Sequence, residues 1–322
     1  MNSYYPLKLK AVSKETVWGG DRLCALFRKG ESSHLGESWE LSVRENEKNI
    51  ILNGAYAGMT LNNYIESRLP EISAYSPFPI LIKFIDAKDD LSVQVHPDDA
   101  TAKRLGDDIV GKTEMWHILE AQDGASIVYG LKEGIGKNEL RLAVKEDRIE
   151  DILNYVPVKR GDTFFIPAGL VHAIGKGIVL AEIQQNSDTT YRFYDYGRPG
   201  LDGKPRELHT EKAIEAFKPF ASEAINTERF EACLDSIPKD ALACCRYFSA
   251  FLKIITKKES FSLDGYDFIS IICLSGCGSI SYDEGSEALS PGDSFFIPAR
   301  LKNISLNGDM TVIISSAPTK SK

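Results

Sequence analysis

The sequence contains one phrase twice, as GDTFFIPAGLVHAI at residues 161–174 and as GDSFFIPARLKNIS at residues 292–305. Both copies begin with a Gly-Asp pair and run through an apolar stretch into an Ile-Pro-Ala sequence. The segments before them also correspond, because an apolar stretch, a glycine-containing turn and a β-branched stretch occur at 116–130 and again at 270–285. A supersecondary unit that occurs twice in one chain predicts two related lobes.

The apolar stretches outside the repeat also predict a mainly β protein. They are short, rich in valine, isoleucine, phenylalanine and tyrosine, and separated by turn residues at intervals of about ten residues. This spacing is typical of barrels and sandwiches, and we expect two β-barrel lobes of the jelly-roll type with a few short helices. Helical patterns or helix-start signals place these helices at about 60–70, 137–156 and 209–217.

The length of the chain favours two domains. Its 322 residues exceed what one hydrophobic core usually serves. Strand signals are lost between about 205 and 240, which we interpret as the connection between the lobes. We therefore expect a first domain over 1–235 and a second over 236–322. The second copy of the phrase has Asn303 where the first has His172, so the C-terminal domain is expected to have no metal site.

Charge and apolar content limit the possible partners. The chain has 38 Lys and Arg against 46 Asp and Glu, a net charge of −8, whereas a general nucleic-acid binder presents a basic face. No run approaches the about 20 apolar residues of a membrane span, and the N-terminal segment has no apolar signal-peptide core. We expect a cytoplasmic protein without nucleic-acid or membrane partners, and six reduced cysteines, since none forms a C-x-x-C pair.

Three polar segments supply candidate metal ligands. In LSVQVHPDD, alternate strand residues face the same way, so Ser92, Gln94 and His96 share one face. GKTEMWHIL contributes Glu114, and GLVHAIG contributes His172 at the end of the first repeated phrase. Two imidazoles, a carboxylate and an amide oxygen form a ligand set that suits a divalent metal, and Zn²⁺ in particular.

The other histidines fit structural roles better. His117 alternates onto the strand face opposite Glu114. His34 and His209 lie in polar, turn-like surroundings, where we expect them to be exposed. None of the three is included in the predicted metal site.

These motifs resemble those of the type I mannose-6-phosphate isomerases (phosphomannose isomerases) in their shorter bacterial form. The repeated GD-x-x-x-IPA phrase is similar to the second sequence motif of the cupins. LSVQVHPDD, GKTEMWHI, GLVHAIG and EIQQNSDTTYRFYDYGR look like segments of the isomerase site, and VWGGDRL and GESWELS near the start also fit. The likeness covers about residues 10–210, whereas the C-terminal lobe shows only the degenerate cupin repeat.

The resemblance implies two cupin-like lobes and a zinc enzyme that interconverts mannose 6-phosphate and fructose 6-phosphate. A proton would move between C1 and C2 of the sugar through a cis-enediol(ate). One Zn²⁺ per chain would be held by the residues that match the family's ligands, which are Gln94, His96, Glu114 and His172.

The resemblance also implies roles for residues around the metal. The family's conserved arginine matches Arg192, and its acidic partner matches Asp188; with Lys112 they are the predicted catalytic residues. Trp18, Ser92, Lys112 and Arg192 match positions that bind the substrate.

The sequence leaves several alternatives open. The general base could be Asp188, Glu40, Lys112 or a water on the metal, or even His96 or His172 if metal binding did not occupy them. The chain could also be a cupin that binds a sugar phosphate without turnover, or an iron-dependent cupin oxygenase. Gln94 in place of the first histidine of a His-x-His motif argues against the oxygenase. The protein could be a monomer or a homodimer.

Overall fold

The computed structural model describes residues 4–106, 110–233 and 235–319 of the chain. Within these residues the fold is mainly β, as the strand pattern predicts, and the strands form four sheets. The outer ends of the two expected domains, 1–235 and 236–322, lie outside the described residues, and their boundary stays a prediction.

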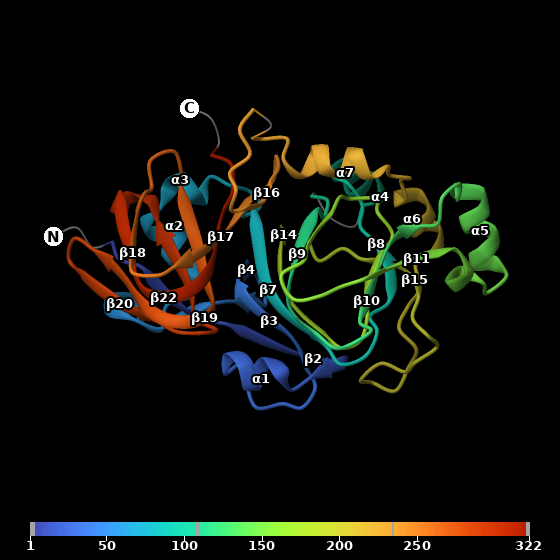
Figure 1. Ribbon diagram of the computed structural model, residues 1–322, viewed down its shortest axis with the longest axis horizontal. Helices are drawn as coiled ribbons and strands as arrows, with labels where there is room; N and C mark the ends of the chain where they lie inside the picture. The colour runs from blue at the N-terminus through green and yellow to red at the C-terminus, as the bar shows by residue number, and fades with distance from the viewer. Residues whose placement is uncertain (1–3, 107–109, 234, 320–322) are drawn as a thin grey trace.

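Two of the sheets lie in the half of the molecule seen on the right of Figure 1. The six-stranded sheet has the order β12 (Thr163–Ile166), β9 (Glu114–Ala121), β14 (Ile178–Gln185), β7 (Ile80–Ala87), β2 (Val12–Gly20) and β3 (Leu35–Leu41). The five-stranded sheet has the order β11 (Leu153–Pro157), β10 (Ser126–Leu131), β13 (His172–Ile174), β8 (Val93–Val95) and β15 (Tyr191–Tyr194). The candidate metal ligands lie on or beside strands of both sheets.

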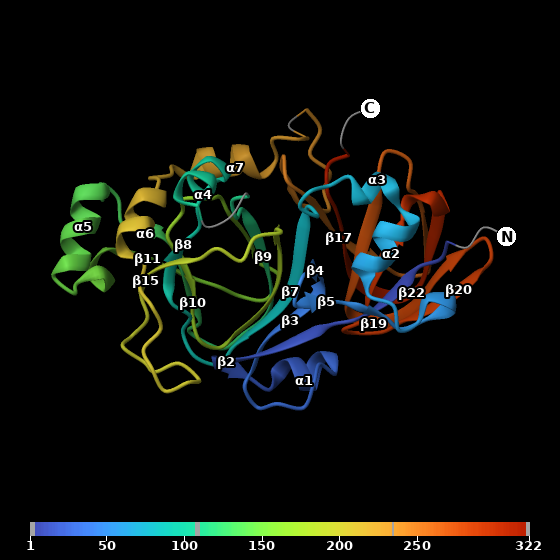
Figure 2. The ribbon, with the colours of Figure 1, turned by 180° about the vertical axis from the view of Figure 1, so that it is seen from behind.

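The nine-stranded sheet forms the other half, which is on the right when the molecule is seen from behind in Figure 2. Its main path is β16 (Ala241–Cys244), β17 (Ser249–Ile255), β22 (Asn303–Ser316), β19 (Phe268–Tyr282), β21 (Ser294–Pro298), β1 (Leu7–Lys10) and β6 (Ile50–Ile51). β18 (Lys258–Ser262) pairs with β22, and β20 (Gly285–Leu289) pairs with β19. β4 (Val43–Arg44) and β5 (Glu47–Lys48) form a separate two-stranded sheet.

The repeated phrase has the same structure in both halves. The strand order β12-β9-β14-β7 of the first half returns as β21-β19-β22-β17 in the second. Each Gly-Asp turn uses a glycine with positive φ, 91° at Gly161 and 83° at Gly292. The next residue, Asp162 or Asp293, accepts a hydrogen bond from the backbone N–H three residues earlier, at 2.8 Å and 2.9 Å. The phrase therefore specifies a turn and a core strand in both places.

The helices are short and lie around the sheets. The α-helices are α1 (Arg22–Phe27), α2 (Leu61–Arg68), α3 (Pro70–Ser73), α4 (Asp99–Leu105), α5 (Lys137–Lys145), α6 (Thr210–Ala216) and α7 (Ser222–Arg229). Short 3₁₀ turns are η1 (Gly54–Tyr56), η2 (Ile149–Ile152) and η3 (Ala299–Leu301). α2 begins after Thr60, whose hydroxyl accepts a hydrogen bond from the backbone N–H of Asn63, as its capping role requires.

The helix expected over 137–156 is wrong in its second half. α5 ends at Lys145, Asp147 takes a left-handed conformation with φ 56°, and β11 begins at Leu153. The charge pairs that continue the helical pattern are worth only a few tenths of a kcal/mol each, about 0.2–0.5. Pairing of β11 with β10, together with burial of Leu153, overrides them.

The N-terminal strand ties the two halves together. β1 pairs with β21, where Leu7 lies opposite Phe296, although the two residues are far apart in the sequence. Lys8 adds an ion pair of 2.8 Å to Asp293, the aspartate of the second Gly-Asp turn. The C-terminal sheet therefore includes strands from the start of the chain.

Glu40 also joins the two halves and is not part of the site. Its carboxylate is fully buried and lies 2.7 Å from Nζ of Lys29. It accepts hydrogen bonds from Ser38 at 2.6 Å and from the Ser294 hydroxyl of the C-terminal sheet. The suggestion that Glu40 could be the general base is therefore wrong, because its strand carries it to the interface instead of the site.

We predict that Glu40→Leu destabilises the protein by about 3–5 kcal/mol, because it leaves the buried Lys29 ammonium unpaired. The free energy of unfolding can be measured by urea denaturation. The double variant Lys29→Met/Glu40→Leu should recover much of the loss, since it removes both buried charges. Glu211→Ala breaks an exposed ion pair with Arg141 and should leave the urea midpoint unchanged. Equal stability of Glu40→Leu and wild type would contradict this account.

Candidate metal centre and substrate cavity

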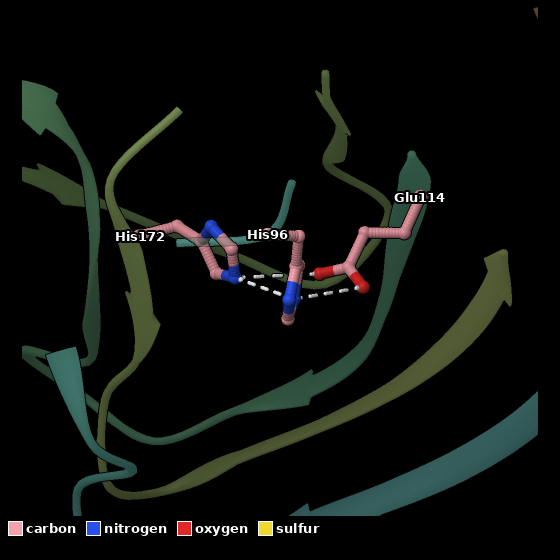
Figure 3. Close-up of side chains that lie close together, drawn as sticks. All are labelled: His96, Glu114 and His172. Atoms are coloured by element: carbon pink, nitrogen blue, oxygen red, sulfur yellow. Dashed lines mark hydrogen bonds and ion pairs between the residues drawn. The ribbon is translucent and has the colours of Figure 1, made fainter. Parts of the chain in front are cut away.

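Two histidines and a glutamate converge between the two sheets of the first half. His96 directly follows β8, His172 begins β13 and Glu114 begins β9. Figure 3 shows their side chains pointing toward one another, and one ligand atom from each lies within 4.8 Å of the others. All three side chains are buried. The cluster could therefore hold a metal ion.

The ring nitrogens of the two histidines have defined roles. Nδ1 of His96 lies 2.9 Å from the carbonyl oxygen of Thr189, and Nδ1 of His172 lies 2.8 Å from that of Leu170. Because a carbonyl oxygen only accepts hydrogen bonds, each Nδ1 carries the proton. The two Nε2 atoms present lone pairs and face each other at 3.1 Å, and Nζ of Lys112 also lies 3.1 Å from Nε2 of His96. Burial lowers the pKa of both rings, to about 3 for His96, so protonation does not relieve this contact.

The carboxylate of Glu114 completes the cluster. Its Oε2 lies 3.5 Å from Nε2 of His96, and its Oε1 lies 3.6 Å from Nε2 of His172. Within the described residues neither oxygen has a hydrogen bond of good geometry, although Nζ of Lys112 lies 2.6 Å from Oε2. Burial is the largest single influence on Glu114 and would raise its pKa, but Lys112, His96 and His172 together outweigh it and hold this pKa well below its ordinary value. An ionised, buried carboxylate beside two imidazole lone pairs fits a bound cation.

Gln94 reaches the cluster with its amide group. Its Nε2 lies 3.3 Å from Nε2 of His172, and its Oε1 accepts a hydrogen bond from Ser92 at 3.2 Å. Rotation of the amide by half a turn would direct the oxygen to the cluster instead, since the two ends have nearly the same shape. Its place as a fourth ligand stays a prediction.

A cavity of about 260 Å³ opens next to the cluster. Six of the residues predicted from the sequence lie on its wall, namely Trp18, Ser92, Gln94, Lys112, Asp188 and Arg192. A larger hollow of about 500 Å³ beside α2 includes none of them. The structure therefore brings the residues predicted for catalysis and substrate binding into one cavity with the metal cluster beneath it.

The wall also contains charged residues that the sequence analysis missed. Nζ of Lys83 lies 3.6 Å from Glu37 and 3.5 Å from Oε1 of Glu182, and both carboxylates and Lys83 line the cavity. Burial, and then the charge of Glu114, raises the pKa of Glu182. Lys83 and Glu182 occur in the apolar strands ILIKFIDA and IVLAEIQQ, where an isolated charge was the available signal.

Asp188 and Arg192 lie on the same wall without forming an ion pair. The described residues include no carboxylate within 4 Å of the Arg192 guanidinium, and its buried Nε has no hydrogen-bond partner there. Desolvation alone would raise the pKa of Asp188, but the charges of Lys83 and Lys112 outweigh it and lower this pKa. Arg192 is therefore available to a ligand.

The remaining histidines lie away from the cluster. His117 is buried on the opposite face of β9, where its Nδ1 contacts the Thr163 hydroxyl at 2.9 Å. His34 is exposed, as expected. His209 is only partly exposed, because its backbone N–H donates to the carbonyl of Arg192 and holds it against β15.

We predict that His96→Ala, His172→Ala and Glu114→Ala each lose bound metal, since each removes one ligand atom of the cluster. Metal content of the purified variants can be measured by mass spectrometry. His117→Ala is the matched control, because it removes a buried histidine from the same strand and should keep the metal. A cluster variant with the full metal content of wild type would contradict the assignment.

Comparison with known proteins agrees with this geometry. A family model described as the catalytic domain of type I phosphomannose isomerase matches residues 7–123, and one described as the cupin domain of mannose-6-phosphate isomerase matches 239–317. The mannose-6-phosphate isomerase ManA of Bacillus subtilis is 36% identical over 312 residues, 96% of this chain and 98% of the relative. The enzyme of that name from Streptococcus mutans is 36% identical over 313 residues, with the same two coverages of 96% and 98%.

Solved structures show the same likeness. The crystal structure of the mannose 6-phosphate isomerase from Bacillus subtilis matches with a TM-score of 0.86 and 32% identity, over 96% of this chain and 99% of that one. The apo form from Salmonella typhimurium shares the fold at 17% identity and a TM-score of 0.74, over 99% and 100% of the chains. The likeness extends into the C-terminal sheet, beyond the segments that the motifs reached. The chain belongs to the family of type I mannose-6-phosphate isomerases.

Proposed function

We propose that this protein is a zinc-dependent isomerase that interconverts mannose 6-phosphate and fructose 6-phosphate. The observation that carries the proposal is the pair of facing imidazole lone pairs with the Glu114 carboxylate, placed beneath a polar cavity that fits a small ligand. Membership in the family and the names of the relatives support the substrate. A non-catalytic sugar-phosphate-binding cupin and an iron-dependent cupin oxygenase are the alternatives that the experiments below test.

The spacing of the candidate ligand atoms supports zinc. Ligands about 2.0–2.1 Å from a tetrahedral zinc lie about 3.3 Å from one another. The two imidazole nitrogens are 3.1 Å apart, and each has a different Glu114 oxygen nearby, Oε2 at 3.5 Å from His96 and Oε1 at 3.6 Å from His172. We assign Gln94 as the fourth ligand, with its amide oxygen turned to the cluster. When bound, the zinc ion supplies positive charge that stabilises negative charge on the sugar oxygens near C1 and C2.

The reaction requires groups that move protons at C1 and C2. A proton leaves C2 of mannose 6-phosphate and returns at C1, while a second proton moves between O1 and O2. Lys112 lies next to the cluster, and Glu182 lies near it, with Oε1 3.9 Å from the Lys112 ammonium. Burial raises the pKa of Glu182, which is the direction that favours a carboxyl group that accepts and returns a proton. Asp188, on the wall, is the other candidate for this role.

The phosphate supplies binding energy away from the reacting carbons, which can be used to orient the sugar. Arg192 is suited to hold it because its guanidinium has no ion-pair partner within the described residues. Trp18 and Ser92 would contact the sugar from the same wall.

Some broader features belong to the same proposal. We propose that the two halves form two cupin-like barrel lobes, and that the C-terminal lobe has no metal site, since Asn303 lies on its exposed surface. The described residues contain no helix long and apolar enough to cross a membrane. We place the protein in the cytoplasm, as a monomer or homodimer.

The first experiment measures metal and turnover together. The purified protein should contain one zinc per chain and convert mannose 6-phosphate to fructose 6-phosphate. A chelator should abolish conversion, and added Zn²⁺ should restore it. Zinc-loaded protein that binds the sugar phosphate without converting it would refute the enzyme. Bound iron with oxygen consumption would support the oxygenase instead.

We predict that Arg192→Ala keeps its zinc but loses much of its kcat, because binding energy from the phosphate no longer orients the sugar. Zinc content and steady-state kinetics of the variant test this. Unchanged turnover would rule out a catalytic contribution of Arg192.

We predict that Glu182→Gln lowers kcat by about 10²–10⁴-fold, the usual range for loss of an acid–base group. The amide retains the shape of the side chain, so zinc content and the urea midpoint should stay at wild-type values. Glu37→Gln changes the other carboxylate beside Lys83 and is the control. We expect it to lower kcat by less than Glu182→Gln does. A Glu182→Gln variant with kcat near that of wild type would exclude Glu182 as the proton carrier.

A further inference from the structure

The positive charges on the cavity wall differ in how they are compensated. Nζ of Lys112 lies 2.6 Å from Glu114, and Lys83 lies between Glu37 and Glu182. Lys14 lies 3.1 Å from Glu47 and over the ring of Trp39. Each of these ammonium groups therefore has a carboxylate partner.

Two guanidinium groups also lie on the wall, and of these Arg206 pairs with Asp195. Arg192 has no ion-pair partner within the described residues, and Arg206 lies on the same cavity wall. Burial, and then the positive charge of Arg206, lowers the pKa of Arg192, so the two groups are close enough to repel. Asp195 compensates Arg206, and Asp195, Asp188 and Glu207 oppose the lowering without pairing with Arg192, so the charge left without a partner on the wall is that of Arg192. An anion bound between the two guanidinium groups would pair with it.

The loop between β15 and α6 holds Arg206 in this place. The chain leaves the sheet after Tyr194 and returns at His209, whose backbone N–H donates to the carbonyl of Arg192 at 2.8 Å. Arg206 is three residues before this return point. An isolated antiparallel β-bridge pairs Pro199 with Pro205 within this loop.

Asp195 fixes the direction of the Arg206 side chain. Its buried carboxylate accepts hydrogen bonds from Nε of Arg206 at 2.6 Å and from Nη2 at 2.5 Å. It also accepts from Arg198 at 2.8 Å. Within the part of the chain that the structure describes, Nη1 of Arg206 has no hydrogen-bond partner. The guanidinium is therefore held on one side, while its other side stays free for a ligand.

We propose that Arg206 is a substrate-binding residue that binds the phosphate group of the sugar phosphate together with Arg192. The inference rests on the proposed function, in which the reacting carbons C1 and C2 lie at the metal and the phosphate on C6 must lie away from it. Two guanidinium groups, one free and one oriented by a buried carboxylate, match the several oxygens of a phosphate. Asp195 is a positioning residue in this arrangement.

The test is the affinity of zinc-loaded protein for inorganic phosphate, measured by calorimetric titration, together with kcat/KM for mannose 6-phosphate. Arg206→Ala should weaken phosphate binding and lower kcat/KM by about 10- to 100-fold, as expected for the loss of a charge-assisted hydrogen bond. Arg206→Lys keeps the positive charge but not the planar set of N–H donors, so its phosphate affinity and kcat/KM should fall by less. The phosphate titration requires no turnover, so it tests Arg206 even if the wild-type chain does not isomerise the sugar.

Arg198→Ala is the matched control, because Arg198 contacts the same Asp195 but does not line the cavity. Arg198→Ala should bind phosphate as wild type does, and the urea midpoint of each variant tests whether it is folded. Phosphate affinity of Arg206→Ala within about twofold of wild type would overturn the proposal. An equal loss in Arg198→Ala and Arg206→Ala would also overturn it, because both would then act only by holding the loop. If Arg206→Ala does not fold, the same comparison is made with Arg206→Lys.

Discussion

The site depends on one constraint, the contact of two imidazole lone pairs at 3.1 Å between His96 and His172. Backbone carbonyls hold both rings in this tautomer, and burial keeps them neutral. Nζ of Lys112 and Nε2 of Gln94 lie 3.1 Å and 3.3 Å from these nitrogens, and two lone pairs this close to a carboxylate suit a bound cation. Glu114 supplies the negative charge that such a cation needs, and Lys112 compensates it.

The repeat shows how a scaffold and a site can be separated. Both copies of the phrase form the same turn and core strand, because glycine, aspartate and the apolar residues have the same local roles in each. His172 is fully buried at the start of β13, whereas Asn303 is exposed at the start of β22. Phe295 and Ile297 belong to a cluster of buried hydrophobic residues in the C-terminal sheet. The residues that make the fold are thus independent of those that make the site.

Prediction from the sequence succeeded where a local rule applied. Alternation along a strand placed Gln94 and His96 together and separated His117 from Glu114. Prediction was incomplete where the role of a residue depends on distant partners. Glu182 is the one charged residue of β14 and becomes part of the wall only through its neighbours in other strands.

The sequence by itself determined most of the strands, the Gly-Asp turns and the chemical types of the candidate ligands, because these depend on residues within a few positions of one another. Only the tertiary structure decided which charges face the cavity. It buried Glu40 between the halves, ended the helix early so that β11 could pair, and returned a loop to place Arg206 beside Arg192. The physical reason is that desolvation and Coulomb interaction depend on distance in space, which sequence separation does not determine.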